Sequence, residues 1–343
     1  MKKLILLTMF LAVFFTSCEK ESYEPTPQEL NALQSDEITS KAHVDNSVFV
    51  SSNTNGMLTS FNIGTGLDNP TPRAFSLPYA DADGIVYDEK RNALYHVNRS
   101  DDRLVALPNI SSYVDGDAII PSAMGPASFM QGREATMYNN KVVVADDQTP
   151  GQLKSYHVNI DNISGYREHQ VNFEVWGIQV TDKDLWAIVD ETNKVAYFQD
   201  FFKAQSGQLA ATSMVAIEGL VRTHGLNYDE HSDIMVLTDI GDPTNGTDGG
   251  LIIITNFKSK VMIAGNGGTI PMTGQIRIYG PSTELGNPVD VRLSVEKNAI
   301  FVAERKQNNG KFLIFEYPTS GGDIKPLSST LVAGATAVEA DFK

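Results

Sequence analysis

The stretch HGLNYDEHSDIMVLTD, residues 224–239, repeats the outline of an earlier stretch, DGIVYDEKRNALYHVN, residues 83–98. In each, a short apolar segment leads through an acidic turn into a second apolar run. Two apolar runs joined by a short polar turn are typical of a β-hairpin. Self-similarity between distant parts of a chain indicates a fold built from repeated units, so the search for further copies comes first.

The same unit recurs along most of the chain. Its strongest β-runs end at Ser52, Asn98, Asp146, Asp190, Asp239 and Glu304, at intervals of 46, 48, 44, 49 and 65 residues. Each run is followed by a polar turn and another strand, and most are preceded by a strand. A weaker outer strand completes the unit, as in RAFSLP, residues 73–78, and SMVAIE, residues 213–218. The unit is therefore a four-stranded antiparallel sheet.

A sheet of this kind cannot bury both faces alone, but copies stacked around an axis bury their faces against each other. The sequence thus predicts an all-β fold, a six-bladed β-propeller spanning residues 46–343. The first unit lacks an inner strand, and the C-terminal segment GATAVEADFK, residues 334–343, is the candidate to supply it. Closing blade one in this way removes two exposed sheet edges. The alternative is that the segment is an extra strand of blade six.

The repeats resemble known propeller families. NALYHVNRSDDRLVAL, residues 92–107, is similar to YVTN repeats, and the units as a set resemble NHL repeats. The stretch HGLNYDEHSDIMVLTDIG, residues 224–241, is similar to the SMP-30/gluconolactonase-like type. The resemblance covers residues 47–343 and implies the fold, whereas the chemistry of a propeller depends on its individual residues.

The N-terminus has the pattern of an export signal. Lys2 and Lys3 precede an apolar run that ends at Phe15, so residues 1–17 are predicted to be a signal peptide. The following FTSC resembles a bacterial lipobox, which implies lipidation of Cys18, the only cysteine, and a membrane anchor. The alternative is an ordinary signal peptide with an incidental cysteine. Residues 18–45 are polar and are predicted to be a flexible tether.

Composition limits the partners and the location. Forty-two acidic residues against 27 basic ones give a net charge of −15, which argues against binding to nucleic acid. The acidic run after Cys18 resembles the signal that sends some lipoproteins to the outer face of the outer membrane; it is otherwise the start of a solvated linker. We therefore expect an outer-membrane lipoprotein on the surface or the periplasmic side.

Strand starts and strand ends place polar residues at one mouth of the channel, because inner strands begin and second strands end on the same face of a propeller. The predicted ligand-binding residues there are Asp83, Arg133, Glu134, Trp176, Arg222, His224 and Asp290. The acids at the second-strand ends either face the mouth or cap turns. Arg133 and Arg222 either pair with acids or bind an anion, and Trp176 either stacks on a ligand or packs within its blade.

No cofactor is firmly indicated, but converging carboxylates suit Ca²⁺ or another divalent metal. The SMP-30-like resemblance implies metal ligands at Asp83, His224 and Glu339, although VEADF stands where that family has Glu-Gly-Pro, and His224 stands where it usually has Asn.

No catalytic motif is present, so we predict a binding module for a glycan, peptide or protein rather than an enzyme. The alternative is a metal-dependent, SMP-30-like hydrolase or lactonase.

Overall fold

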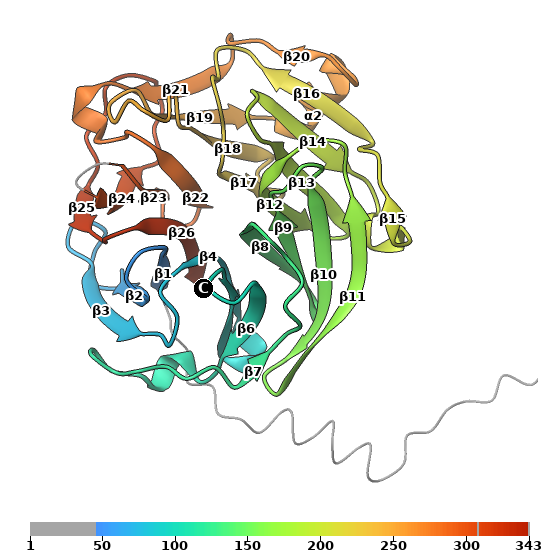
Figure 1. Ribbon diagram of the computed structural model, residues 1–343. Coiled ribbons are helices and arrows are strands. Elements are labelled where there is room, and N and C mark those ends of the chain that lie inside the picture. Colours follow the sequence, from blue (N-terminus) through green and yellow to red (C-terminus); the bar gives the residue numbers. More distant parts are fainter. Residues whose placement is uncertain (1–45, 307–308, 342–343) are drawn as a thin grey trace, which may run out of the picture. The chain divides into compact units, whose positions relative to one another are not determined.

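The computed structural model describes residues 46–306 and 309–341, which form a closed ring of six antiparallel blades (Figure 1). The predicted all-β, six-bladed propeller is thereby confirmed. The predicted signal peptide, the lipidation at Cys18 and the tether lie outside the described residues. Among the described residues, no helix combines the length and the apolar character that crossing a membrane requires.

The first three blades follow one another along the chain. Blade one has the order β26 (Ala335–Asp341), β1 (Ser47–Ser52), β2 (Met57–Asn62) and β3 (Thr71–Ser76). Blade two consists of β4 (Ala82–Asp88), β5 (Ala93–Asn98), β6 (Arg103–Leu107) and β7 (Ala123–Met124). Blade three consists of β8 (Gly132–Tyr138), β9 (Lys141–Asp146), β10 (Gln152–Asn159), β11 (Asn162–Gln170) and the added short strand β15 (Gly207–Gln208).

The remaining blades keep the same plan. Blade four consists of β12 (Val175–Thr181), β13 (Asp184–Val189), β14 (Lys194–Phe198), β16 (Ser213–Ile217) and the short β20 (Thr269–Ile270). Blade five consists of β17 (Leu226–Asp229), β18 (Ile234–Asp239), β19 (Gly250–Thr255) and β21 (Gln275–Tyr279). Blade six consists of β22 (Pro288–Ser294), β23 (Ala299–Glu304), β24 (Lys311–Glu316) and β25 (Ser328–Leu331). One helix, α2 (Phe257–Ala264), lies in the connection from β19 to β20.

The hydrophobic core is divided among the interfaces between neighbouring blades. Each of the six interfaces has its own cluster of buried side chains; Phe49 of blade one, for example, shares a cluster with Leu94 of blade two. The second strands lie between two such clusters, and β1, β5, β18 and β23 are buried at every position. This double burial explains why the second strands are the most continuous apolar runs in the sequence.

The C-terminal strand closes the ring as predicted. β26 pairs antiparallel with β1, with Val50 opposite Val338 and Phe49 opposite Glu339. The last strand therefore becomes the inner strand of the first blade, beside the channel (Figure 1). This pairing covers the edge that β1 would otherwise expose.

A β-bulge interrupts the inner strand at the same place in five blades. The pairing of β4 with β5, for example, slips between Ala82 and Ile85, and β8, β12, β22 and β26 show the same slip. A bulge bends the strand and re-aims its side chains. Here it sets which residue of each inner strand faces the mouth of the channel.

Polar side chains beyond the bulges join neighbouring inner strands. The hydroxyl of Thr136 accepts from Val180 N at 2.9 Å, and the amide of Asn227 accepts from Leu293 N at 2.9 Å. Gln179 both donates to Tyr228 O at 3.1 Å and accepts from Tyr228 N at 2.6 Å. Because neighbouring inner strands belong to different sheets, these side chains satisfy backbone groups that no strand pairing reaches.

Candidate functional site

One residue from each blade lies at the mouth of the channel, in five of the blades at a bulge. In alignment through the strand pairings, these residues are Thr336, Asp83, Arg133, Trp176, His224 and Val289. Four of them were predicted from the sequence to lie there. Glu134 and Asp290 occupy the next position inward, and Glu339 lies well inside β26 rather than at its start. The sequence alignment misplaced these three because it did not include the bulges.

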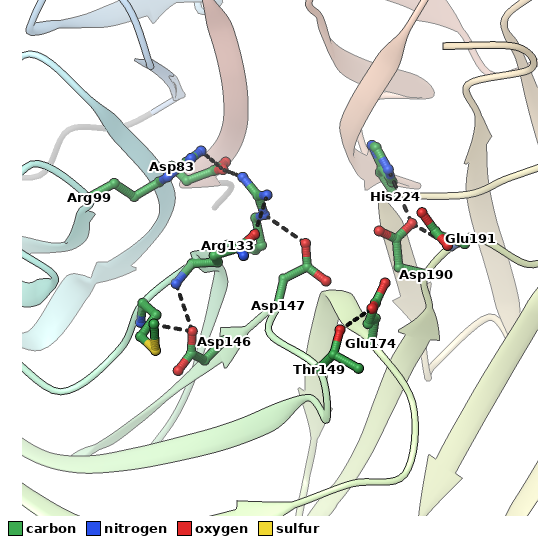
Figure 2. Close-up of polar contacts among 12 residues, drawn as sticks. Asp83, Arg99, Arg133, Asp146, Asp147, Thr149, Glu174, Asp190, Glu191 and His224 are labelled. Carbon is green, nitrogen blue, oxygen red and sulfur yellow. Dashed lines mark hydrogen bonds and ion pairs between the residues drawn. The ribbon is translucent and has the colours of Figure 1, made fainter.

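Arginines surround the carboxylate of Asp83. Arg99 approaches it at 3.2 Å and Arg133 at 3.8 Å, and the hydroxyl of Thr336 donates to its other oxygen at 2.7 Å. Arg133 also binds Asp147 through Nε at 3.2 Å (Figure 2). Both oxygens of Asp83 are therefore occupied by protein groups.

Trp176 and His224 form a stacked pair. Their ring centroids are 3.6 Å apart with an interplanar angle of 5°, and the guanidinium of Arg133 lies 3.9 Å from the indole centroid. Trp176 is only 7% exposed. The indole thus offers little open surface on which a ligand could stack.

Arg222 pairs with Asp190 rather than standing free. Its Nε and one terminal nitrogen donate to the two carboxylate oxygens at 3.0 and 2.9 Å. Burial by itself raises the pKa of Asp190, but contacts with His224 and Arg222 outweigh burial and hold the pKa below its usual range. Asp190 is therefore ionised at neutral pH.

The other second-strand acids are structural. Asp146 accepts from the backbone N–H groups of Met130 and Gln131, Asp239 from those of Val221 and Arg222, and Glu304 from those of Gly286 and Asn287. In each blade the acid holds the loop that leads into the inner strand. Of the two alternatives left open by the sequence, these three acids therefore cap backbone, as Asp and Asn often do in turns.

Asp147, Glu174 and Asp190 form a carboxylate group beside this cluster. One candidate ligand oxygen from each lies within 4.8 Å of the others, and Figure 2 shows the three side chains next to one another. Burial raises the pKa of Asp147 to about 6; Arg133 opposes this rise and the charge of Asp190 adds to it. This is the one such group of acids and histidines in the described part of the chain.

A second charged group is centred on Arg292, on the inner strands. Arg292 contacts Glu339 at 3.1 Å, Asp290 at 3.3 Å and Glu134 at 3.6 Å. Burial raises the pKa of Glu134 well above its usual value, and the neighbouring charge of Asp290 adds to the rise. Burial raises the pKa of Asp290 as well, although Arg292 and the backbone N–H groups of Val338 and Val291 oppose this rise.

Beyond this charged group lies a cavity of about 300 Å³. One channel-facing side chain from each blade lines it: Val86, Thr136, Gln179, Asn227, Arg292 and Glu339. Because three of these side chains already bridge inner strands and two pair with each other, the cavity has few free polar groups to offer a ligand.

Arg305 is the least compensated charge at the mouth. A terminal nitrogen donates to the hydroxyl of Thr336 at 2.6 Å, and its buried Nε has no hydrogen-bond partner among the described residues. Burial lowers the pKa of Arg305; Asp83 opposes this effect, and the nearby charges of Arg133 and Arg99 reinforce it. No carboxylate of a described residue forms an ion pair with it, unlike Arg99, Arg133, Arg222 and Arg292.

The structure does not bring together the metal ligands implied by the family resemblance. Asp83 is held by arginines and Thr336, Glu339 by Arg292, and His224 lies beside Asp190. These residues do not fit one shared ion.

Three residues of the candidate site were not predicted from the sequence. Glu174 stands in a loop rather than at a strand end, Arg292 lies mid-strand, and Arg305 follows the end of the second strand of blade six. The alternation of Asp290 with Arg292 on β22 was the one available signal, because residues two apart on a strand share a face.

The chain matches no protein-family model and no curated protein. Its fold is similar to a chain in the crystal structure of a nidogen–laminin complex, with a TM-score of 0.59 and 10% identity over 85% of this chain and 97% of that chain. It is also similar to a putative 6-phosphogluconolactonase from Bacteroides fragilis, with a TM-score of 0.50 and 12% identity over 87% and 85% of the two chains. At such identities the likenesses show the propeller fold alone, and the repeat family stays a prediction.

Proposed function

We propose that this protein is a lipid-anchored binding module of the cell envelope, which captures the anionic group of a glycan, peptide or protein at the mouth of its propeller channel. The proposed anchor rests on the sequence pattern around Cys18. If it is right, Cys18→Ser moves the protein from the membrane fraction to the soluble fraction of a Gram-negative host.

The observation that carries the proposal is that Arg305, which contacts the hydroxyl of Thr336 and the ring of Trp176, forms no ion pair with a carboxylate of the described residues. A partly buried guanidinium without a paired carboxylate is unfavourable, and a bound carboxylate, sulfate or phosphate would compensate it. The other mouth arginines are already paired with Asp83, Asp147 and Asp190. Arg305 is therefore the group with the most to gain from an external anion.

The rigid setting of Arg305 supports the same conclusion. Its backbone N–H donates to Asn287 O at 3.0 Å, and its side chain is held by Thr336, which in turn donates to Asp83. A preorganised donor loses little side-chain entropy when a ligand arrives.

One observation favours the alternative of a metal-dependent hydrolase or lactonase. Burial lowers the pKa of His224 to about 4, although the charge of Asp190 opposes this effect, so its imidazole is neutral at pH 7 and lies beside the Asp190 carboxylate. A neutral imidazole is able to accept a proton or to ligate a metal ion. Lactone hydrolysis that depends on an added metal and is lost in His224→Gln would support this alternative.

Calorimetric titration tests the binding proposal with three probes: an oligogalacturonide, an oligoglutamate peptide and a neutral oligosaccharide. We expect saturable binding of at least one acidic probe and none of the neutral one. Arg305→Gln should weaken that binding at least tenfold, because the anion loses its main charge partner.

Arg73→Gln is the matched control, since Arg73 lies on the outer strand β3 and donates to Tyr113 O. It should bind like the wild type. Failure of both acidic probes to bind the wild type, or equal binding by Arg305→Gln, would refute the proposal.

A further inference from the structure

Asp147, Glu174 and Asp190 meet at the ring mouth from two blades and the loop between them. Asp147 follows β9, Glu174 precedes β12 and Asp190 follows β13. Two ligands on opposite sides of a calcium ion are separated by up to about 5 Å, twice the usual Ca–O distance. The spacing of the three carboxylates, within 4.8 Å of one another, therefore allows one ion to reach all three.

A cluster of acids alone does not indicate a ion site, but His224 supplies an independent indication. It is only 4% exposed, and neither ring nitrogen has a hydrogen-bond partner in the described residues. Its Nε2 lies 3.3 Å from Oδ1 of Asp190 without the alignment of a hydrogen bond, and Figure 2 shows the ring next to that carboxylate. Buried polar nitrogens without partners are costly and call for an explanation.

Asp147 also has a buried polar atom without a hydrogen-bond partner. One carboxylate oxygen accepts from Arg133, whereas the other, Oδ1, is buried without a hydrogen-bond partner. A carboxylate oxygen has strong acceptor capacity, so leaving it buried and unused is unfavourable. A cation in the group would satisfy this oxygen.

We propose that Asp147, Glu174 and Asp190 bind one divalent cation at the mouth of the propeller, with the His224 ring next to Asp190 at the edge of the group. The three ligands differ from the set Asp83, His224 and Glu339 implied by the family resemblance, because the two sets share no residue. The site does not depend on anion binding at Arg305.

The charges around the group set the expected strength of binding. Arg133 and Arg222 already offset part of the negative charge on Asp147 and Asp190, whereas the Glu174 carboxylate has, among the described residues, only the hydroxyl of Thr149 as its partner. Fewer uncompensated ligand charges weaken the binding of calcium, as in extracellular modules with Kd values of about 10⁻⁴–10⁻³ M. Carboxylate oxygen ligands favour Ca²⁺ or Mn²⁺ over Zn²⁺.

Metal titration of the metal-free chain tests the site, with Ca²⁺, Mn²⁺ and Zn²⁺ each used alone. Calorimetry should show saturable binding of one ion per chain for at least one metal, and that metal should raise the melting temperature. Glu174→Gln should weaken binding at least tenfold, because the amide keeps an acceptor for Thr149 but loses the charge.

Glu191→Gln is the matched control, since Glu191 is an exposed neighbour of Asp190 outside the carboxylate group. It should bind metal like the wild type, as should Arg305→Gln, so a failed anion proposal leaves this result intact. Absence of saturable binding for all three metals, or unchanged binding in Glu174→Gln, would overturn the inference.

Discussion

At the scale of single residues, burial decides which titratable groups carry charge. His96 of β5 is fully buried, and its Nδ1 forms a hydrogen bond of 2.9 Å with the hydroxyl of Tyr79. Burial lowers its pKa to about 3, although the charge of Asp83 acts in the opposite direction. The neutral ring is therefore part of the folded structure.

This shift predicts a loss of stability in acid. The unfolded chain binds a proton at His96 below pH 6.5 and the folded chain does so only near pH 3, so stability falls as the pH drops from 6.5 toward 3. Between pH 7 and 5 the loss is about 2 kcal/mol. Urea unfolding at both pH values should show a smaller loss for His96→Gln than for the wild type. His231→Gln, which replaces an exposed histidine, should keep the wild-type loss; equal losses in all three proteins would contradict this role of His96.

The sequence placed many mouth residues correctly but could not say what they contact. Asp83, Arg133, Trp176 and His224 follow from where apolar strands begin, because strand periodicity is local. The pairing of Arg222 with Asp190, by contrast, joins two blades, and no local pattern encodes it. For the same reason, the sequence could not show that Arg305 lacks the carboxylate partner that the other mouth arginines have.

At the scale of the strand, the bulges and the glycines after them explain why the strands were predicted correctly and the positions of some mouth residues were not. In β12, Gly177 follows Trp176, and a Cβ built on it would lie 2.3 Å from the carbonyl oxygen of His224. Glycine is needed here because the backbone of the next blade passes so close. The strands themselves were predictable from apolar runs, whereas the one-residue insertions were not, since a bulge leaves no regular sequence period.

Gly177→Ala should therefore destabilise the propeller by about 1–3 kcal/mol, the usual range for overpacking. The added methyl group meets backbone, which cannot rotate away as a side chain could. Chemical unfolding measures the loss, and Gly165→Ala on β11 is the control, because its Cβ would meet nothing within 4 Å. A Gly177→Ala variant as stable as the Gly165→Ala control would show that the inner strands can separate at little cost.

At the scale of the whole molecule, side chains from three blades meet at Arg292 in the channel. Arg292 of blade six faces Glu134 of blade three and Glu339 of blade one. Removing one partner of a buried ion pair costs about 3–5 kcal/mol, so Arg292→Met should lower the free energy of unfolding strongly.

Glu134→Gln, unlike Arg292→Met, should not lower the free energy of unfolding strongly, because the amide imitates the protonated side chain of Glu134. A buried acid with a raised pKa stabilises the fold at low pH and loses that contribution as the pH rises through its folded pKa. The stability of Glu134→Gln relative to the wild type should thus increase from pH 6 to pH 8. A constant difference across this range would mean that Glu134 is ionised in the folded protein.

Closure of the ring was predictable because it follows from counting strands: the first unit lacked an inner strand and the chain ended with a spare one. β26 also contributes Thr336, which holds Arg305, and Glu339, which pairs with Arg292, so closure and the candidate site depend on the same segment.

Deleting residues 334–343 should expose the edge of β1 and remove both contacts. We expect the truncated chain to lose its cooperative thermal transition and to associate through the open edge, as measured by calorimetry and size-exclusion chromatography. Deleting only residues 342–343 should leave both measurements unchanged. A truncated chain that stays monomeric and melts within a few degrees of the wild type would show that five complete blades hold the ring without its closing strand.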